Sequence, residues 1–360
     1  MTAEAIGLAL PWPGGLEDVS ECPVCGDPRR REERADLHDE SFAAAPGTWR
    51  LQRCLGCQAL YLGPRPDRAT LHLAYRNYYT HATPPQTAAG FLARTRRALS
   101  NGYRNRVFAT NLQPSLGAGA VVMPLFASRA AHIRREDRGL GRAATNGGRV
   151  LDVGCGNGGF LAWARELGWQ CYGVEIDAAA AAVVRDLGIA VLGSELRELG
   201  AEHLASFDAV TLSHVIEHVY DPVETLRQCW RLLKPGGYLW IETPNTDSSG
   251  YEIYGSHWRG LEAPRHLVLF NIGSLRWILE RAGFERIQCL PPTDVTASVF
   301  TLSASMQSGR IAEKDARSLP PDIRARTRAA VRRARGIASR DPAKAEFVTA
   351  VAYRPPARSD

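Results

Sequence analysis

The run Val150-Leu151-Asp152-Val153-Gly154-Cys155-Gly156-Asn157-Gly158-Gly159 decides the fold of this chain. An apolar strand leads directly into a glycine-rich turn and then into a helix-forming segment. Such a turn needs glycine because its backbone angles suit few other residues and because a ligand must approach the main chain closely. The run alone does not identify the ligand, since Gly154, Gly156 and Gly159 also satisfy the fingerprint of dinucleotide sites.

Short apolar strands alternate with amphipathic helices from about residue 148 to residue 296. This alternation predicts βαβ units and therefore an α/β fold with a doubly wound, Rossmann-like parallel sheet. The expected strands are Arg149–Val153, Gln170–Val174, Ile189–Leu192, Phe207–Leu212, Tyr238–Thr243, Arg286–Leu290 and Glu346–Tyr353. The expected helices are Phe160–Gly168, Ala178–Leu187, Pro222–Leu233 and Ser274–Ala282.

Two carboxylates accompany the glycine turn. Asp152 stands at the end of the first strand, where it could accept hydrogen bonds from a cationic amino-acid ligand but would repel a pyrophosphate. Glu175 stands at the end of the next strand, where a carboxylate can hold both hydroxyls of a ribose. Dinucleotide sites and sites for other nucleosides both bind a ribose. The segments downstream are therefore needed to distinguish these two classes of site.

Those segments are Phe207–Val219, which contains His214-Val215-Ile216-Glu217-His218, and Leu232–Asn245. Together with the glycine turn they make the sequence resemble the class I S-adenosylmethionine-dependent methyltransferases over roughly residues 148–296 and the final strand. The resemblance implies a seven-stranded, mostly parallel sheet with a last antiparallel strand. Many relatives carry an aspartate after the third strand, where this chain has Glu195 and Leu196. The cofactor contacts that the resemblance implies are Asp152, Gly154, Cys155, Gly156, Glu175, Ile176, Glu195, Leu196 and Ser213.

The segment after the fourth strand is the candidate catalytic region. Methyl transfer requires an aligned nucleophile and, where needed, removal of a proton. In a helix, His214, Glu217 and His218 would share one face. Three interpretations stay open: a histidine base oriented by Glu217, a divalent-cation site that includes His266, or packing and capping residues.

Candidate acceptor contacts lie in the loop 255–267. Trp258, Arg259 and Arg265 would suit an acceptor that carries a ring and a phosphate, with arginine as a bidentate anion clamp. Tyr78 and Tyr79 are expected either over the same pocket or as a packing stripe. A solvated structural loop is the alternative for the whole group.

Cys22, Cys25, Cys54 and Cys57 form two Cys-x-x-Cys pairs. Two such knuckles complete the four-sulfur tetrahedral cage of a structural Zn²⁺, which predicts a small zinc-ribbon-like module; redox dithiols are the rival interpretation. We expect this module at 18–66, a helical connecting region and possible substrate cap at 67–147, and the methyltransferase domain at 148–360. A basic helical insert is expected at 303–345.

The whole pattern resembles sugar C-methyltransferases and related enzymes of polysaccharide and secondary-metabolite pathways, which implies a small acceptor such as a nucleotide-linked sugar or a glycan. O-methylation stays equally open. A zinc-ribbon RNA methyltransferase is an alternative, although the Asn-Pro-Pro-Tyr type of motif that holds a flipped base is absent after the fourth strand. A non-catalytic zinc-ribbon interaction protein on the same fold is a further alternative.

The composition is that of an ordinary globular protein. Of 360 residues, 45% are hydrophobic and 23% are charged, which excludes a disordered or collagen-like chain. The formal charge of +6 is compatible with phosphate-bearing partners. No apolar run is long enough for a transmembrane segment, and the N-terminus lacks the positive charge of a secretory signal, so we expect a cytoplasmic protein.

Overall fold

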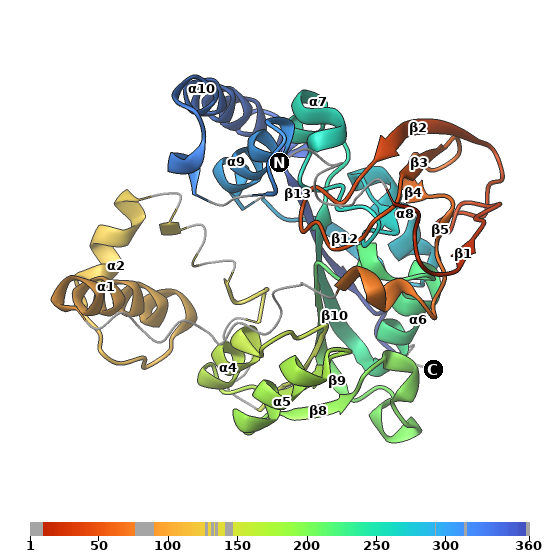
Figure 1. Ribbon diagram of the computed structural model, residues 1–360. Helices are drawn as coiled ribbons and strands as arrows, with labels where there is room; N and C mark the ends of the chain where they lie inside the picture. Colours follow the sequence, from red (N-terminus) through yellow and green to blue (C-terminus); the bar gives the residue numbers. More distant parts are fainter. Residues whose placement is uncertain are drawn as a thin grey trace. The chain divides into compact units, whose positions relative to one another are not determined.

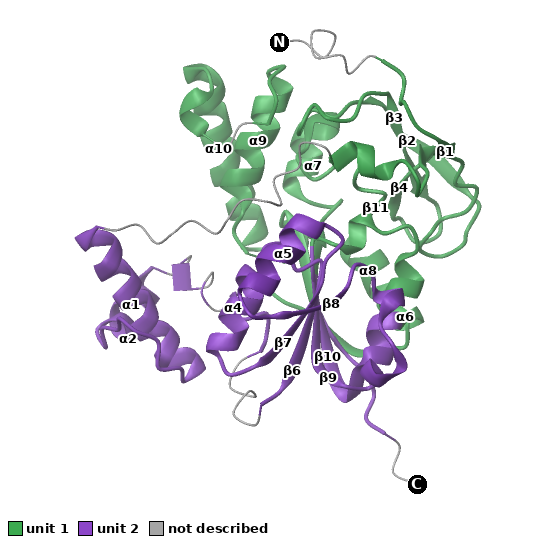
Figure 2. Ribbon diagram, turned by 60° about the horizontal axis from the view of Figure 1, so that its bottom comes forward, with its two compact units in different colours: residues 1–78, 214–227, 242–350 green, residues 79–213, 228–241, 351–360 purple. Residues whose placement is uncertain are grey.

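A computed structural model describes residues 10–75, 90–126, 129–130, 133, 136–140, 147–291, 293–312 and 315–357. The chain divides into two compact units, which Figure 2 colours separately. Unit 1 comprises residues 1–78, 214–227 and 242–350, and unit 2 comprises residues 79–213, 228–241 and 351–360. The units cut across the domain boundaries expected from the sequence, because each unit gathers segments that lie far apart in the chain.

Unit 2 contains the strands that flank the glycine turn. Strands β6 (Arg149–Val153) and β7 (Gln170–Val174) are parallel and in register from Arg149 opposite Gln170 to Val153 opposite Val174. Strand β9 (Phe207–Ser213) pairs parallel with the other side of β6, and β8 (Ala190–Gly193) pairs parallel with β7. The carboxyl ends of these strands therefore lie at one edge, where the predicted cofactor residues follow them.

The full sheet has seven strands in the order β12-β13-β10-β9-β6-β7-β8, of which Figure 2 labels β6 to β10. Its remaining strands are β10 (Leu233–Pro244), β12 (Glu285–Cys289) and β13 (Phe347–Tyr353). This order and the parallel pairs confirm the predicted Rossmann-like α/β fold. Strands β6 and β7 have the predicted bounds, whereas β10 begins five residues earlier than the expected start at Tyr238.

Helices α4 (Gly159–Glu166) and α5 (Ala178–Asp186) follow β6 and β7. Leu161 and Ala164 on α4 are fully buried in one apolar cluster with Val150 of β6 and Ala209 of β9. The side chain of Asp177 caps α5 by accepting hydrogen bonds from the backbone N–H groups of Ala179 and Ala180. This packing holds the glycine turn between a buried strand and a buried helix.

The described part of the expected connecting region includes helical segments. It contains α1 (Phe91–Phe108), α2 (Gly119–Val122) and the 3-10 turn η4 (Met123–Leu125). Tyr103, Phe108 and Met123 form a buried cluster of their own, and Trp163 of α4 packs against it.

Unit 1 contains two small sheets. Strands β1 (Leu16–Glu17) and β5 (Arg65–Pro66) form a two-stranded sheet. Strands β2 (Arg30–Leu37), β3 (Trp49–Cys54) and β4 (Leu60–Leu62) form an antiparallel meander, which β11 (Val268–Leu269) extends by pairing with β4. The sheet that carries the cysteines is therefore completed by a strand about 200 residues downstream in the chain. Local sequence patterns did not indicate this pairing.

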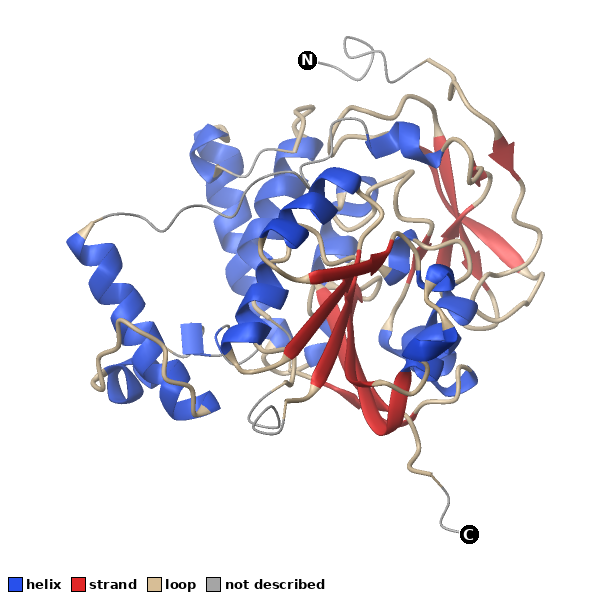
Figure 3. Cartoon of the chain, turned by 90° about the horizontal axis from the view of Figure 1, so that it is seen from below, coloured by secondary structure: helices blue, strands red, loops and turns tan. Residues whose placement is uncertain are grey.

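The α-helices of unit 1 come mostly from residues 242–350, which Figure 1 colours from teal to blue, and Figure 3 distinguishes helices from strands along the chain. Asn271 and Ser274 form a reciprocal capping box at the start of α8. The helices of this segment are α7 (Ser249–Tyr254), α8 (Ile272–Arg281), α9 (Thr296–Gln307) and α10 (Pro321–Ala338). Helix α6 (Pro222–Leu232) contributes residues to both units, and the 3-10 turns are η2 (Leu71–Tyr75), η6 (Leu196–Glu198), η7 (Ala201–His203), η8 (Ile216–His218), η9 (Gly255–His257), η10 (Ala316–Ser318) and η11 (Pro342–Lys344).

Within the described ranges, every helix is too short or too polar to cross a bilayer.

Candidate functional site

The glycine turn of unit 2 has the backbone geometry that its sequence predicts. Gly154 and Gly156 adopt φ angles of 67° and 53°, which lie in the left-handed region that favours glycine. A Cβ at Gly156 would meet no atom within 4 Å, so open space lies beside the turn. The N–H groups of Gly154 and Cys155 both donate to the carbonyl of Val174, at 2.8 and 3.2 Å, which ties the turn to β7.

Glu175 braces this turn from the end of β7. Its Oε2 accepts from the N–H of Gly156 at 2.7 Å, and its Oε1 accepts from the N–H of Asp177 at 2.9 Å. Burial raises the pKa of Glu175, and these two backbone hydrogen bonds partly oppose that rise. Each carboxylate oxygen retains a lone pair beyond the bond it already accepts, so Glu175 can still accept from a ribose diol.

Asp152 requires a correction. Its carboxylate is 2% exposed and accepts hydrogen bonds from Thr211 Oγ1 at 2.6 Å and from Arg138 Nη1 at 2.5 Å. Asp152 therefore links β6, β9 and the segment around Arg138, so both of these hydrogen bonds are internal to unit 2 and a direct contact with a ligand is not what they support. Arg138, which also stacks over the ring of Phe160 at 3.8 Å, was missed because nothing near it in the sequence marks a partner 14 residues away.

The other expected cofactor residues differ in exposure. Ile176 is 73% exposed, which leaves an apolar side chain beside Glu175 free to cover a ring. Cys155 is buried, and its sulfur lies where a Cβ at Gly173 would fall, so its side chain packs inside the unit. Glu195 is paired with Arg197 at 2.8 Å, and Leu196 is buried. Ser213 is the last residue of β9.

In unit 1, His214 and Glu217 form a hydrogen-bonded dyad. His214 Nδ1 lies 3.1 Å from Glu217 Oε1, and its Nε2 lies 3.8 Å from Glu242 Oε1. His214 has a φ of 55°, so the segment is not the α-helix that the shared-face argument assumed; η8 begins two residues later. The His214 side chain nevertheless keeps 36% of its surface exposed, whereas Glu217 is fully buried.

The two groups of the dyad shift each other's pKa values. Burial acts to lower the pKa of His214, but the hydrogen bond to Glu217 and the nearby carboxylates raise it overall. Burial acts to raise the pKa of Glu217, but the hydrogen bond from His214 and the neighbouring histidines lower it to about 2. Thr243 Oγ1 donates to Glu217 Oε2 at 3.1 Å and completes the support of this carboxylate. Glu217 is thus an anion held to orient an imidazole.

His218 and His266 face each other beside Glu217. Their ring centroids are 4.7 Å apart at an interplanar angle of 76°. The phenol of Tyr75, the last residue of η2, lies 3.0 Å from His218 Nδ1. Burial lowers the pKa of His266 to about 4, so this imidazole is neutral near pH 7.

The expected acceptor loop also requires correction. The guanidinium of Arg265 is fully buried and paired with the buried carboxylate of Asp39, and it donates to the carbonyl of Ala74 at 2.7 Å. Trp258 is 1% exposed, and its Nε1 donates to Glu346 Oε2 at 2.9 Å. Both side chains hold unit 1 together and do not clamp an anion, because their polar groups are used internally.

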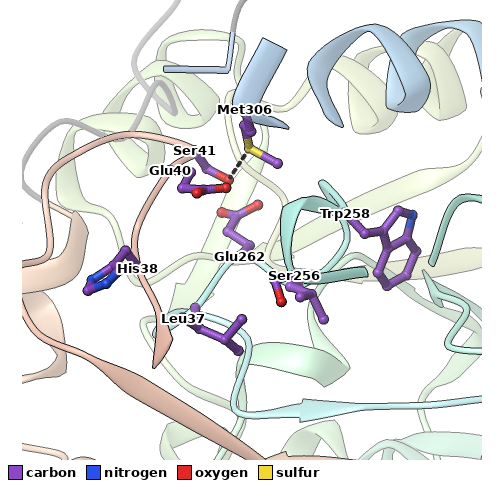
Figure 4. Close-up of a pocket in the computed structure, with 10 residues that line it drawn as sticks. Leu37, His38, Glu40, Ser41, Ser256, Trp258, Glu262 and Met306 are labelled. Carbon is purple, nitrogen blue, oxygen red and sulfur yellow. Dashed lines mark hydrogen bonds between the residues drawn. The ribbon is translucent and has the colours of Figure 1, made fainter. Parts of the chain in front are cut away.

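The side chain of Arg259 is 22% exposed and pairs with Glu262, so its positive charge is already neutralised. Tyr78 and Tyr79 lie outside the described residues. A small hollow nearby is lined by Glu40, Ser41, Glu262 and Met306, among others (Figure 4). Both carboxylates facing it are already in ion pairs, Glu40 with His257 at 2.8 Å and Glu262 with Arg259.

The four N-terminal cysteines converge as their spacing predicts. Their sulfur atoms all lie within 4.8 Å of one another, with Cys22–Cys57 at 3.6 Å and Cys25–Cys54 at 3.4 Å. A tetrahedral Zn²⁺ with Zn–S bonds of about 2.3 Å requires sulfur separations of about 3.8 Å, so the cage fits the ion after a small expansion. All four are free thiols.

The sheet order, the glycine turn and the acidic residue after β7 define a methyltransferase Rossmann-like α/β fold. Consistent with this class, residues 126–289 match the family model described as "Methyltransferase domain". Residues 126–289, less than half of the 360 residues, are therefore similar to methyltransferase domains.

Among curated proteins, the chain is similar to the ubiquinone biosynthesis O-methyltransferases of Pseudomonas aeruginosa and Xanthomonas campestris. Identity to the former is 36% over 119 residues, covering 31% of this chain and 50% of that protein. Identity to the latter is 35% over 125 residues, covering 33% and 52%. The chain thus spans about half the length of the curated relatives it matches. A SAM-dependent methyltransferase from Archaeoglobus fulgidus shares 22% identity over 64% of this chain and 94% of that chain, with a TM-score of 0.39.

Proposed function

We propose that this protein is an S-adenosylmethionine-dependent methyltransferase that acts on a small-molecule acceptor. The observation that carries the proposal is the glycine turn after β6, braced by the Glu175 carboxylate from the end of β7. Open space beside Gly156 leaves room for a ligand against the main chain, and the exposed Ile176 supplies an apolar surface for a base. These residues fit a nucleoside donor.

Unit 2 would bind and orient this donor. Glu175 would accept hydrogen bonds from the ribose hydroxyls while its backbone bonds keep the carboxylate in place, and Ile176 would cover the adenine. Gly154 and Gly156 would allow the main chain to approach the rest of the molecule. When bound, S-adenosylmethionine supplies a methyl group on a sulfonium, which an acceptor atom takes by in-line displacement.

The proposed base is His214. With Nδ1 donating to Glu217, the neutral imidazole carries its lone pair on Nε2, which is the atom that would take a proton from the acceptor. Glu217 is then a positioning residue: it selects this tautomer and stabilises the imidazolium formed. His214 stands next to Ser213, the last residue of β9, and strand ends of this kind carry the chemistry in open α/β sheets.

The proposed acceptor is a small molecule with an oxygen or an acidic carbon to deprotonate. The named activity of the curated relatives favours oxygen. A nucleotide-linked sugar or a glycan, as the sequence resemblance suggested, belongs to this class, but internal pairing of Arg265 removes one of the two arginines expected to hold its phosphate. Incubating cell extract with S-adenosylmethionine labelled with ¹³C at the methyl group would reveal the methylated product by its mass shift, and the NMR chemical shift of the labelled methyl carbon would distinguish a C-methyl from an O-methyl product.

The test of donor binding is calorimetry with S-adenosylhomocysteine. Glu175→Ala removes two charge-assisted acceptors, each contributing about 1.5–3 kcal/mol, so affinity should fall at least about 100-fold. Glu202→Ala, at a side chain 72% exposed in the same unit, should bind like the wild type. Unchanged binding by Glu175→Ala would refute the proposal, whereas tight binding without methyl transfer to any acceptor would favour the non-catalytic alternative.

We further propose that the four-cysteine cage binds a structural Zn²⁺. Four thiolates leave no open position for chemistry and stabilise a small fold. Metal analysis should find one equivalent of zinc fewer in Cys54→Ser than in the wild type. Cys229→Ser, which alters a buried cysteine of α6 away from the cage, should retain the wild-type content. Equal zinc in both variants would contradict the assignment.

An RNA acceptor is the second candidate, because α10 exposes Arg326, Arg328, Arg332 and Arg333 while its other face is buried. If these four arginines contact phosphates of a single strand, log K should fall against log salt with a slope of about −3. Replacing all four with alanine should flatten the slope. A weak, salt-independent response of the wild type would eliminate RNA.

A further inference from the structure

Glu217, His218 and His266 converge from two segments of unit 1. Glu217 and His218 come from η8, and His266 lies two residues before the start of β11. Each offers one potential ligand atom, and the three atoms lie within 4.8 Å of one another. Glu217 is fully buried and His266 is 5% exposed. This cluster is separate from the four-cysteine cage.

The orientation of both imidazoles is set by backbone carbonyls. His266 Nδ1 lies 2.8 Å from the carbonyl oxygen of Gly260, and His218 Nδ1 lies 3.1 Å from that of Arg265. A carbonyl oxygen only accepts, so an Nδ1 bonded to one carries the proton and the Nε2 of that ring retains its lone pair; Tyr75 Oη, 3.0 Å from His218 Nδ1, then accepts from the same N–H group. Histidines that bind metals normally donate their other N–H group to a carbonyl or carboxylate in this way, which fixes the tautomer and the ring orientation.

Glu217 provides a negative charge within the cluster, and Glu262 Oε2 lies 3.8 Å from His266 Nε2. Its Oε1 accepts from His214 and its Oε2 accepts from Thr243, both at 3.1 Å, so the carboxylate is held in one orientation. Each oxygen keeps a further lone pair for another partner. Two oriented nitrogen donors and one fixed carboxylate therefore meet in a largely buried place.

We infer that Glu217, His218 and His266 bind a divalent transition-metal ion as a second metal site. Two imidazole nitrogens with one carboxylate suit Zn²⁺, Co²⁺ or Fe²⁺ better than Mg²⁺ or Ca²⁺, which prefer oxygen ligands throughout. Three protein ligands leave a coordination position open, unlike the closed cysteine cage. The open position would hold an acceptor oxygen; that role rests on the proposed function, whereas metal binding itself does not.

The test is the zinc content of the full chain, measured by elemental analysis after saturation with Zn²⁺ and removal of the excess by gel filtration. His266→Asn and His218→Asn are the informative variants. An asparagine amide can replace Nδ1–H as donor to the same carbonyl, and it removes only Nε2. Loss of an outer-shell partner already weakens metal sites 10- to 100-fold, so loss of a ligand should weaken binding more than about 100-fold.

We expect each of these variants to retain one equivalent of zinc fewer than the wild type. The matched control is His257→Ala, at a histidine that pairs with Glu40 outside the cluster and should leave the zinc content unchanged. Equal zinc in His266→Asn and the wild type overturns the inference, whatever the cysteine cage binds. In the same variant, unchanged affinity for S-adenosylhomocysteine is expected, so failure of this site is distinguishable from failure of donor binding.

Discussion

Glu346 links the stability of unit 1 to pH. It is 2% exposed and accepts hydrogen bonds from Trp258 Nε1 and from the N–H of Gly250, both at 2.9 Å. Burial raises the pKa of Glu346 to about 7, because these bonds only partly compensate for lost hydration of the carboxylate. The ordinary value of 4.5 applies to the unfolded chain.

The free energy of unfolding falls as the pH rises, because the pKa of Glu346 is higher in the folded chain than in the unfolded chain. Between pH 4.5 and about 7 the unfolded chain ionises Glu346 while the folded chain keeps it protonated, so unfolding becomes easier as the pH rises. At 1.36 kcal/mol per pH unit, the full loss of stability is about 3 kcal/mol, and about 2.5 kcal/mol of it develops between pH 5 and pH 8. The contribution is fully present below pH 4.5 and is lost as the pH passes about 7.

The perturbation that isolates this effect is Glu346→Gln, which cannot ionise. Urea unfolding at pH 5 and pH 8 should show that the wild type loses about 2.5 kcal/mol more than the variant across this interval. Glu252→Gln, at a side chain 74% exposed on α7, should change with pH as the wild type does. Parallel behaviour of wild type and Glu346→Gln would refute the reasoning.

The remaining predictions concern packing and the donor site. Arg265→Leu should lower the free energy of unfolding by about 3–5 kcal/mol, because it leaves the buried Asp39 without its cation; a loss below 1 kcal/mol in denaturant titrations would contradict the pairing. Leu161→Ala should lower it by about 2–5 kcal/mol through a cavity in the core, visible in the same titrations. Ile176→Ala should weaken S-adenosylhomocysteine binding about fivefold in calorimetry without changing stability, since covering about 40 Å² of apolar surface contributes about 1 kcal/mol. Ile253→Ala, at a residue 45% exposed in unit 1, is its control and should bind like the wild type.

The elements around the donor site could be predicted because their signals are local. The apolar run Arg149–Val153 and the glycines after it describe a buried strand and a left-handed turn without reference to any distant residue. Glu175 follows the next strand, and parallel register alone brings it to the turn. The convergence of the cysteines is also predictable from short segments, because each Cys-x-x-Cys knuckle directs two sulfur atoms to one point.

The chemistry of unit 1 could be predicted only in part. His214 and Glu217 are three residues apart and do form a dyad, but through a left-handed residue and not through the helix that the spacing suggested. The role of Arg265 was misjudged, because Asp39, which neutralises it, lies 226 residues away in the chain. Asp152 was misjudged for the same reason, since the groups that occupy it belong to β9 and to the segment around Arg138.

By itself, then, the order of amino acids determined what short-range forces decide: strand and helix periodicity, the glycine turn and the cysteine knuckles. Tertiary structure decided which charged side chains are free to meet a ligand. A guanidinium or carboxylate looks alike in sequence whether it faces water or a buried counter-ion, and burial depends on segments brought together by folding. The approach of His266 to Glu217 and His218 is of this second kind, since the two segments are about 50 residues apart in the chain and are joined by the hydrogen bond from the N–H of Leu267 to the carbonyl of Glu217 at 2.7 Å.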